Sequence, residues 1–208
     1  MATAISGVSG ASTTTVKGWA TADIAATTSA EMSALTSAQV AVMTTAQVVA
    51  LSTNQVVALK TAQLAALTTA QIAKMETDDI AVITTDQIGA MSTAQVASLT
   101  TDQVVAMTTA QVAVFTTDQV VALTTDQMSN LKTAQLASLT AKQVAVIETD
   151  DLVSLTTAQL VGLSSSQVAG IKATDLDELS TAQVRALSNT ALAGLTTAQV
   201  AGMTTTQV

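Results

Sequence analysis

Residues 35–58 read LTSAQVAV, MTTAQVVA and LSTNQVVA, which is one octad written three times. The octad consists of a large apolar residue, two hydroxyl residues, a variable residue, Gln, a second apolar residue, a variable residue and a small residue. We call the two apolar residues the first and second anchors, and the glutamine site the Gln position. The pattern continues in register along the chain. A fixed short period of this kind is typical of a repeat array.

The anchors are aliphatic with few exceptions. The first anchors are Leu35, Met43, Leu51, Leu59, Leu67, Met75, Ile83, Met91, Leu99, Met107, Phe115, Leu123 and so on to Met203. The second anchors are Val40, Val48, Val56, Leu64, Ile72, Ile80, Ile88, Val96 and so on to Val208. Weaker octads precede them at 11–18, 19–26 and 27–34. We therefore predict a flexible arm at 1–10 and a single octad-repeat solenoid at 11–208, with weak repeats at 11–34 and regular repeats at 35–208.

Each octad carries the signals of a helix start. A Thr followed three residues later by Gln is a capping box, and the anchors on either side of it are placed as a hydrophobic staple. Lys60, Glu76, Lys132, Glu148 and Lys172 replace the first hydroxyl residue. The second hydroxyl residue is therefore an alternative N-cap, and it would shorten each helix by one residue.

One continuous helix does not fit an eight-residue period, because each octad would drift by about 80° around the helix axis. A β-solenoid is the alternative fold, since Thr and Val favour strands. However, the anchors do not alternate with a period of two, and the chain has only eight Gly and no Pro for corners. A single octad buries too little apolar surface to fold alone, so each must pack on its neighbours. We predict an all-α solenoid of about 24 short, two-turn helices.

Composition limits the functional classes. The net charge is −8 and the seven basic residues are scattered singly, whereas nucleic-acid binding needs clustered Lys and Arg. The apolar runs are too short for a membrane helix, so we expect no membrane insertion. There is no Cys, which excludes disulfides and thiolate metal sites,. No basic region followed by an apolar one marks a signal peptide near the start of the sequence.

The only candidate metal or catalytic groups are three carboxylate clusters. They are Glu76, Asp78 and Asp79; Glu148, Asp150 and Asp151; and Asp175, Asp177 and Glu178. Calcium prefers carboxylate ligands, but no calcium-loop motif surrounds these acids. We interpret them as helix-start acids that the helix dipole favours. With no His, Cys or Tyr, the usual acid–base and nucleophile arrangements cannot form. We therefore expect no enzyme, no cofactor and no metal.

The octads resemble two known kinds of repeat. LTTDQVVAM at 99–107 resembles the first helix of TAL-effector DNA-binding repeats, which begin L-T-P-x-Q-V-V-A-I. The proline, the base-reading loop and the second helix of that unit are absent here, so the resemblance implies a helix but no DNA reading. The octads as a whole are similar to the Thr/Ala-rich repeat segments of large bacterial surface, adhesin-like or filament proteins. This second resemblance implies an extracellular or cell-surface structural protein.

We predict a non-catalytic protein that associates with itself end to end, as a filament, matrix or adhesin-stalk component. The sequence lacks a polar capping repeat at its end, and solenoids with an open apolar end associate head to tail. Trp19 stands at a first-anchor site, where it either closes the array or anchors a partner. The candidate contact residues are Trp19, Ile24, Leu192, Leu195, Val200, Met203 and Val208. The alternative function is a regular Thr lattice that binds ice or a polysaccharide.

Overall fold

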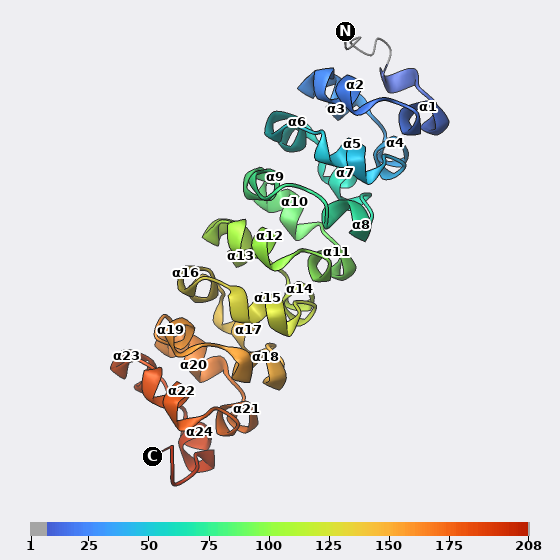
Figure 1. The fold of residues 1–208 in the computed structure, drawn as a ribbon. Helices are drawn as coiled ribbons and strands as arrows, with labels where there is room; N and C mark the ends of the chain where they lie inside the picture. Colours follow the sequence, from blue (N-terminus) through green and yellow to red (C-terminus); the bar gives the residue numbers. More distant parts are fainter. Residues whose placement is uncertain (1–7, 208) are drawn as a thin grey trace. The chain divides into compact units, whose positions relative to one another are not determined.

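Every complete octad between residues 35 and 202 forms one short helix in the computed structural model, which describes residues 8–207. These residues hold 24 α-helices and the 3₁₀ helix Val8–Gly10, with no strand among them. The prediction of an all-α solenoid is thus confirmed, and the β-solenoid alternative is wrong. The helices have four to six residues, which is less than the two full turns that we predicted because one turn takes 3.6 residues. Figure 1 shows their succession along the chain.

The chain divides into two compact units, one up to Met107 and one from Thr108 onward. In the first unit the helices are α1 Thr13–Lys17, α2 Thr21–Ala26, α3 Ser29–Ala34, α4 Ser37–Ala41, α5 Thr45–Val49, α6 Thr53–Ala58, α7 Thr61–Ala65, α8 Thr69–Ile72, α9 Thr77–Val82, α10 Thr85–Gly89, α11 Thr93–Ala97 and α12 Thr101–Ala106. In the second unit they are α13 Thr109–Ala113, α14 Thr117–Val121, α15 Thr125–Asn130, α16 Thr133–Ala137, α17 Ala141–Val144, α18 Thr149–Ser154, α19 Thr157–Leu160, α20 Ser165–Gly170, α21 Ala173–Asp177, α22 Thr181–Ala186, α23 Asn189–Leu192 and α24 Thr197–Gly202.

The predicted arm and single array stay predictions. Residues 1–7 lie outside the described part of the chain. Val8, within the predicted arm, is buried, and its carbonyl oxygen accepts a hydrogen bond from Gln39 Nε2 at 3.5 Å.

The first hydroxyl residue of the octad is the N-cap. In α5, Thr44 Oγ1 accepts from the backbone N–H of Gln47 at 3.2 Å, and Gln47 Oε1 accepts from the backbone N–H of Thr44 at 2.7 Å. This reciprocal pair satisfies two N–H groups that a helix start leaves without partners. Where Lys132 occupies the cap site, its side chain makes no cap bond. Its backbone N–H still donates to Gln135 Oε1 at 2.8 Å. The glutamine therefore preserves the helix start when the hydroxyl is missing.

The two rows of anchors form the core of each unit. Most second anchors, such as Val48 and Ile88, are fully buried, and most first anchors, such as Leu51 and Met91, are almost as buried. Two large apolar side chains in every eight residues are thus removed from water, which is the main favourable term in folding. The repeat supplies this core evenly along each unit.

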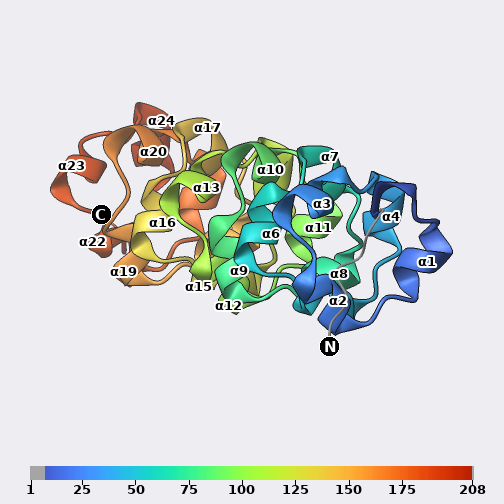
Figure 2. The same ribbon diagram turned by 90° about the horizontal axis from the view of Figure 1, so that it is seen from above.

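Within each unit, most helices pack against the helix three positions before or after them in the chain. Thus α6 contacts α3 and α9, and α9 contacts α12. Two perpendicular views agree in placing α6 and α9 side by side (Figure 1, Figure 2). Successive turns of the coil therefore stack on one another within each unit.

A buried glutamine fastens each turn of the coil to the previous one. Gln47 Nε2 donates to the carbonyl oxygens of Trp19 at 2.8 Å and Val16 at 2.9 Å, which lie 28 and 31 residues earlier. We call this interaction the strap. Straps with the same 28-residue register also start at Gln39, Gln55, Gln63, Gln71, Gln87, Gln95 and Gln103 in the first unit and at Gln143, Gln159, Gln167, Gln183, Gln199 and Gln207 in the second. Since an octad has eight residues, one coil turn takes about three and a half octads.

Some turns approach so closely that only glycine fits. A Cβ added to Gly170 would lie 2.7 Å from the carbonyl oxygen of Ala141, and one added to Gly194 would lie 2.3 Å from that of Ser165. A Cβ added to Gly89 would meet nothing within 4 Å. Glycine thus permits close backbone contact at 170 and 194, whereas Gly89 has no such role.

We predict that replacing a strap glutamine with an apolar residue destabilises the coil. Gln95 accepts from Ser92 N at 2.8 Å and donates to Leu67 O at 2.7 Å. Gln95→Leu leaves these buried backbone groups unpaired, which costs roughly 2–4 kcal/mol. Urea unfolding followed by circular dichroism measures the change. The control Asp102→Asn, at an exposed side chain, should shift stability by less than about 0.5 kcal/mol. If the two variants change the free energy of unfolding equally, the glutamine strap does not stabilise the coil.

We predict opposite effects for two glycine substitutions. Gly170→Ala should lower the free energy of unfolding by about 1–3 kcal/mol, because the added Cβ overpacks the contact with Ala141,. Gly89→Ala should raise it by roughly 0.5–1 kcal/mol, because alanine has less backbone entropy to lose. The same urea titration compares them. A stabilising Gly170→Ala would show that the approach between these turns is looser than described.

Candidate functional site

The carboxylate clusters are spread over helix ends and do not converge. In the first cluster, Glu76 and Asp78 are exposed while Asp79 is buried. The second cluster begins α18 in the same way. The third differs, because Asp177 is the last residue of α21 and Glu178 its C-cap. The interpretation of these two residues as helix-start acids is therefore wrong. Among residues 8–207 no three acidic, His or Cys side chains are arranged to hold a metal ion.

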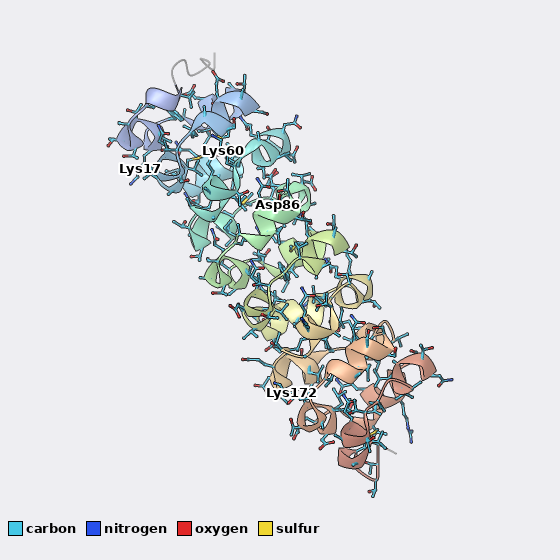
Figure 3. All side chains as sticks on the ribbon, turned by 180° about the vertical axis from the view of Figure 1, so that it is seen from behind. Lys17, Lys60, Asp86 and Lys172 are labelled. Carbon is cyan, nitrogen blue, oxygen red and sulfur yellow. The ribbon has the colours of Figure 1, made fainter. Side chains whose placement is uncertain are left out.

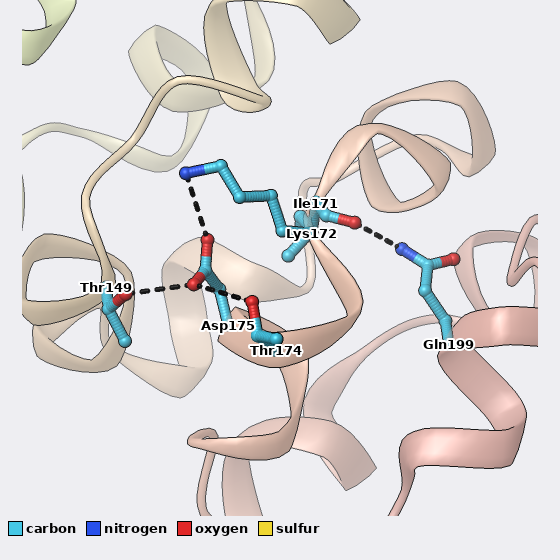
Figure 4. A network of polar contacts seen from close by, with 6 residues as sticks. All are labelled: Thr149, Ile171, Lys172, Thr174, Asp175 and Gln199. Atoms are coloured by element: carbon cyan, nitrogen blue, oxygen red, sulfur yellow. Dashed lines mark hydrogen bonds and ion pairs between the residues drawn. The ribbon is translucent and has the colours of Figure 1, made fainter.

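The carboxylate of Asp175, which occupies a Gln position, contacts three neighbouring side chains. Thr149 Oγ1, from α18, donates to Asp175 Oδ1 at 2.9 Å, and Thr174 Oγ1 donates to the same oxygen at 3.4 Å. Lys172 Nζ lies 3.6 Å from Asp175 Oδ2. Figure 4 shows these contacts beside the strap from Gln199 to the carbonyl oxygen of Ile171. The network joins α18 to α21 within the second unit.

An open hollow of about 380 Å³ adjoins this network. Its lining residues are Glu148, Thr149, Asp150 and Lys172. Ligand pockets usually combine an apolar lining with a few polar groups, and this hollow is mainly polar. The hydroxyl of its lining residue Thr149 donates to the carboxylate of Asp175 at 2.9 Å and so belongs to the network described above.

Two buried acids at Gln positions have altered acidity. Burial, followed by the negative charges of Glu76 and Asp78, raises the pKa of Asp79 to about 6. Burial also raises the pKa of Asp151, although a hydrogen bond from the side chain of Thr125 opposes that shift. Perturbed acids often mark functional sites, but here each stands in the strap row and not in a cleft.

The structure separates the predicted contact residues by exposure. Ile24 is fully buried in its own coil. Trp19, Leu192, Leu195 and Met203 are only partly buried, unlike anchors inside the units. Val200 is 50% exposed, so this second anchor faces solvent. Val208 lies outside the described residues.

The second hydroxyl residue of the octad lies at the surface in rows. Thr45, Thr69 and Thr93 are exposed, and they begin α5, α8 and α11, which contact one another in sequence. At some equivalent sites the hydroxyl donates to the next coil turn instead, as Ser37 Oγ does to Ala62 O at 3.0 Å. The N-cap hydroxyls, by contrast, are engaged in capping.

Most of the charged side chains are exposed and dispersed, although Asp79, Asp151 and Asp175 are buried. In the first unit Lys17, Lys60 and Asp86 are exposed, and Figure 3 shows them at separate places along the coil. They form no basic patch that would follow a phosphate backbone. Among the described residues, no helix is long and apolar enough to cross a bilayer.

Sequence reasoning missed the second role of the glutamines. The capping box explained their side-chain oxygen, whereas the amide nitrogen fastens a turn 28 residues away, as in Gln47. One signal was present: Gln fills this position in most regular octads, although Glu would complete a capping box equally well. A consistent preference for the neutral amide indicates that its N–H groups are needed.

The comparisons with known proteins agree with the repeated coil. The ALTTAQ repeat profile matches residues 16–53, 48–75, 72–109, 105–133, 144–181 and 168–205, which together cover more than half of the chain. No curated protein matches the chain significantly. The octads form capped helices that glutamine straps join to the previous coil turn. The chain therefore belongs to the ALTTAQ repeat family.

Proposed function

We propose that this chain is a non-catalytic structural protein, a regular coil that serves as a spacer in a filament, matrix or adhesin stalk. The strap register carries the proposal. The same 28-residue contact recurs from Gln39 to Gln103 in the first unit and from Gln143 to Gln207 in the second. Each unit thus repeats one contact at regular intervals, as a spacer requires, while its chemically reactive side chains are few and dispersed.

The side-chain chemistry supports a non-catalytic role. The sequence has no His, Cys or Tyr. The N-cap hydroxyls of α5 and α13, at Thr44 and Thr108, are held by hydrogen bonds to their own helix starts. A nucleophilic hydroxyl is activated by an adjacent general base, whereas these two hydroxyls accept from the backbone N–H groups of Gln47 and Gln111.

We further propose that the protein associates with itself end to end. Val200 is half exposed, and Leu192, Leu195 and Met203 are less buried than equivalent anchors within the units. An octad packed against these residues, whether from further chain or from a second copy, would bury their apolar surface. Trp19, which is only partly buried, is the counterpart that we propose on the second copy. Contacts between different surfaces of identical chains propagate as filaments unless they close into a ring.

An extracellular or cell-surface location is part of the same proposal. It is supported by the acidic, Cys-free and Thr-rich composition. Fractionation of the source cells, with surface proteolysis of intact cells, tests this location directly.

A second candidate function is binding to ice or a polysaccharide. The row of Thr45, Thr69 and Thr93 favours it, because these exposed residues begin three helices that contact in succession. A row of this kind presents methyl and hydroxyl groups at regular intervals. Such a surface suits a partner that is itself periodic.

We predict that self-association depends on Val200. Sedimentation velocity at rising protein concentration should show growing assemblies, and negative-stain microscopy should show filaments or rings. Val200→Asp should abolish them, because a charge in a buried apolar contact is strongly unfavourable. The matched control is Val121→Asp, at another exposed valine of the second unit, which should leave assembly unchanged. A monodisperse monomer at high concentration would contradict this part of the proposal.

We predict that any binding to ice or glycans is lost when Thr45, Thr69 and Thr93 are all replaced by Val. The change keeps the side-chain shape and removes the hydroxyl. Ice-recrystallisation assays and glycan arrays measure the loss, and the triple Thr→Ser variant is the control that retains the hydroxyls. If the wild-type protein is inactive in both assays, or if the Val variant remains active, the second candidate is wrong.

A further inference from the structure

Some of the strap sites hold an acid instead of glutamine. Asp79, Asp151 and Asp175 occupy Gln positions and are all buried, with Asp79 only 2% exposed. A glutamine amide has both an acceptor and a donor, whereas an ionised carboxylate is only an acceptor. An ionised aspartate can therefore accept a bond from its own helix start, but it cannot donate to the previous coil turn.

The strap register predicts which carbonyl groups of the previous coil turn lie closest to Asp79. Counting back 28 and 31 residues, as the glutamines do, gives the carbonyl groups of Leu51 and Val48. The two neighbouring straps keep this register, since Gln71 reaches Met43 and Gln87 reaches Leu59. Asp79 Oδ2 is buried and has no hydrogen-bond partner. Carboxylate oxygen and carbonyl oxygens are both negative, so the ionised form is unfavourable at this site.

The other two acids have partners that Asp79 lacks. A hydrogen bond from the Thr125 side chain reaches Asp151. Asp175 accepts from Thr149 Oγ1 at 2.9 Å and lies 3.6 Å from Lys172 Nζ. The N-cap residue of α21, the helix that contains Asp175, is Lys172. The N-cap residue of α9, the helix that contains Asp79, is the acidic Glu76.

No cation compensates the charge of Asp79 from the helices packed against it. Helix α9 contacts α6 and α12. Helix α6 contains no ionisable residue, and the only one in α12 is Asp102, which is exposed. Within α9 the charged neighbours are Asp78 and the cap residue Glu76. The charges of Glu76 and Asp78 oppose a negative charge at Asp79.

We propose that Asp79 is a proton-dependent strap. With its carboxyl group protonated, the single O–H donates to one backbone carbonyl group of the previous turn, at Leu51 or Val48, in place of the glutamine amide found elsewhere. When the proton leaves, the donor is lost and the contact between α9 and the previous turn loosens. The first unit thus has one turn whose stability depends on pH, among turns that are fastened by neutral glutamines.

The sign of the pH effect follows from the acidity of Asp79. Its pKa in the folded chain is raised from the ordinary 3.8 to about 6, so the folded state binds the proton more tightly than the unfolded state. The contribution of this group to stability is therefore full below about pH 4, and it falls as pH rises to about 6. A difference of about two pKa units corresponds to about a hundredfold change in the local opening equilibrium.

The proposal is tested by titrating stability. Urea midpoints of the wild-type protein and Asp79→Gln are compared from about pH 4.5 to 7.5. We expect Asp79→Gln to be more stable near pH 7.5, and we expect its advantage to shrink as the pH is lowered. The control Asp102→Asn removes an exposed acid of the neighbouring helix and should show no such pH-dependent difference. An advantage of Asp79→Gln that is independent of pH would overturn the proposal.

A second measurement does not depend on a variant. Carbon NMR of the Asp79 carboxyl group in the wild-type chain should show a titration midpoint near pH 6, and a midpoint near pH 4 would overturn the proposal.

Calcium chloride added near pH 7.5 tests whether a cation takes the place of the proton. If calcium raises the midpoint of the wild-type protein but not of Asp79→Gln, a cation strap replaces the proposed proton strap. No response to calcium supports the proton.

Discussion

The structure depends on one side chain that makes two connections. A helix of four to six residues leaves most of its backbone N–H and C=O groups without partners inside the helix,. The strap glutamine satisfies groups at two places at once. Its oxygen accepts from the start of its own helix, and its nitrogen donates to carbonyl groups of the previous coil turn, as Gln103 does for Thr100 and Met75. Such short helices remain folded because local capping and coil stacking use the same residue.

Local features of this fold could be predicted from the sequence, and long-range ones could not. The T-x-x-Q spacing predicts each helix start, and the two anchors predict the buried rows, because both patterns act within one octad. The number of octads per turn leaves no such signature, since every octad has the same pattern whatever the coil diameter. The partners of Gln103 at Ile72 and Met75 therefore had to come from the structure. For the same reason the octad pattern places Asp79 at a helix start but does not reveal its burial against a previous turn.

The proposed roles follow from where the repeat is uniform and where it varies. The uniform parts, which are the anchors and straps, support a structural role because they give each unit the same internal contacts throughout. The variable parts are few. Asp79 places a titratable group where a neutral amide is usual, and Gly170 and Gly194 allow turns to approach more closely than an alanine would permit. Local properties of the coil can thus change at single positions without altering the repeat around them.

Each coil turn takes about three and a half octads, so successive turns are offset by half an octad. This offset has a mechanical consequence. Helix α5 packs against α2, while its Gln47 also reaches back to Val16 in α1. Helix α5 therefore lies across the junction between α1 and α2 of the preceding coil turn. The same offset recurs within each unit wherever a strap keeps the 28-residue register. Because the junctions between helices are offset from one coil turn to the next, they do not line up within a unit. A pulling force therefore meets no straight row of junctions at which the unit could separate. A coil with a whole number of octads per turn would align these junctions in a straight row.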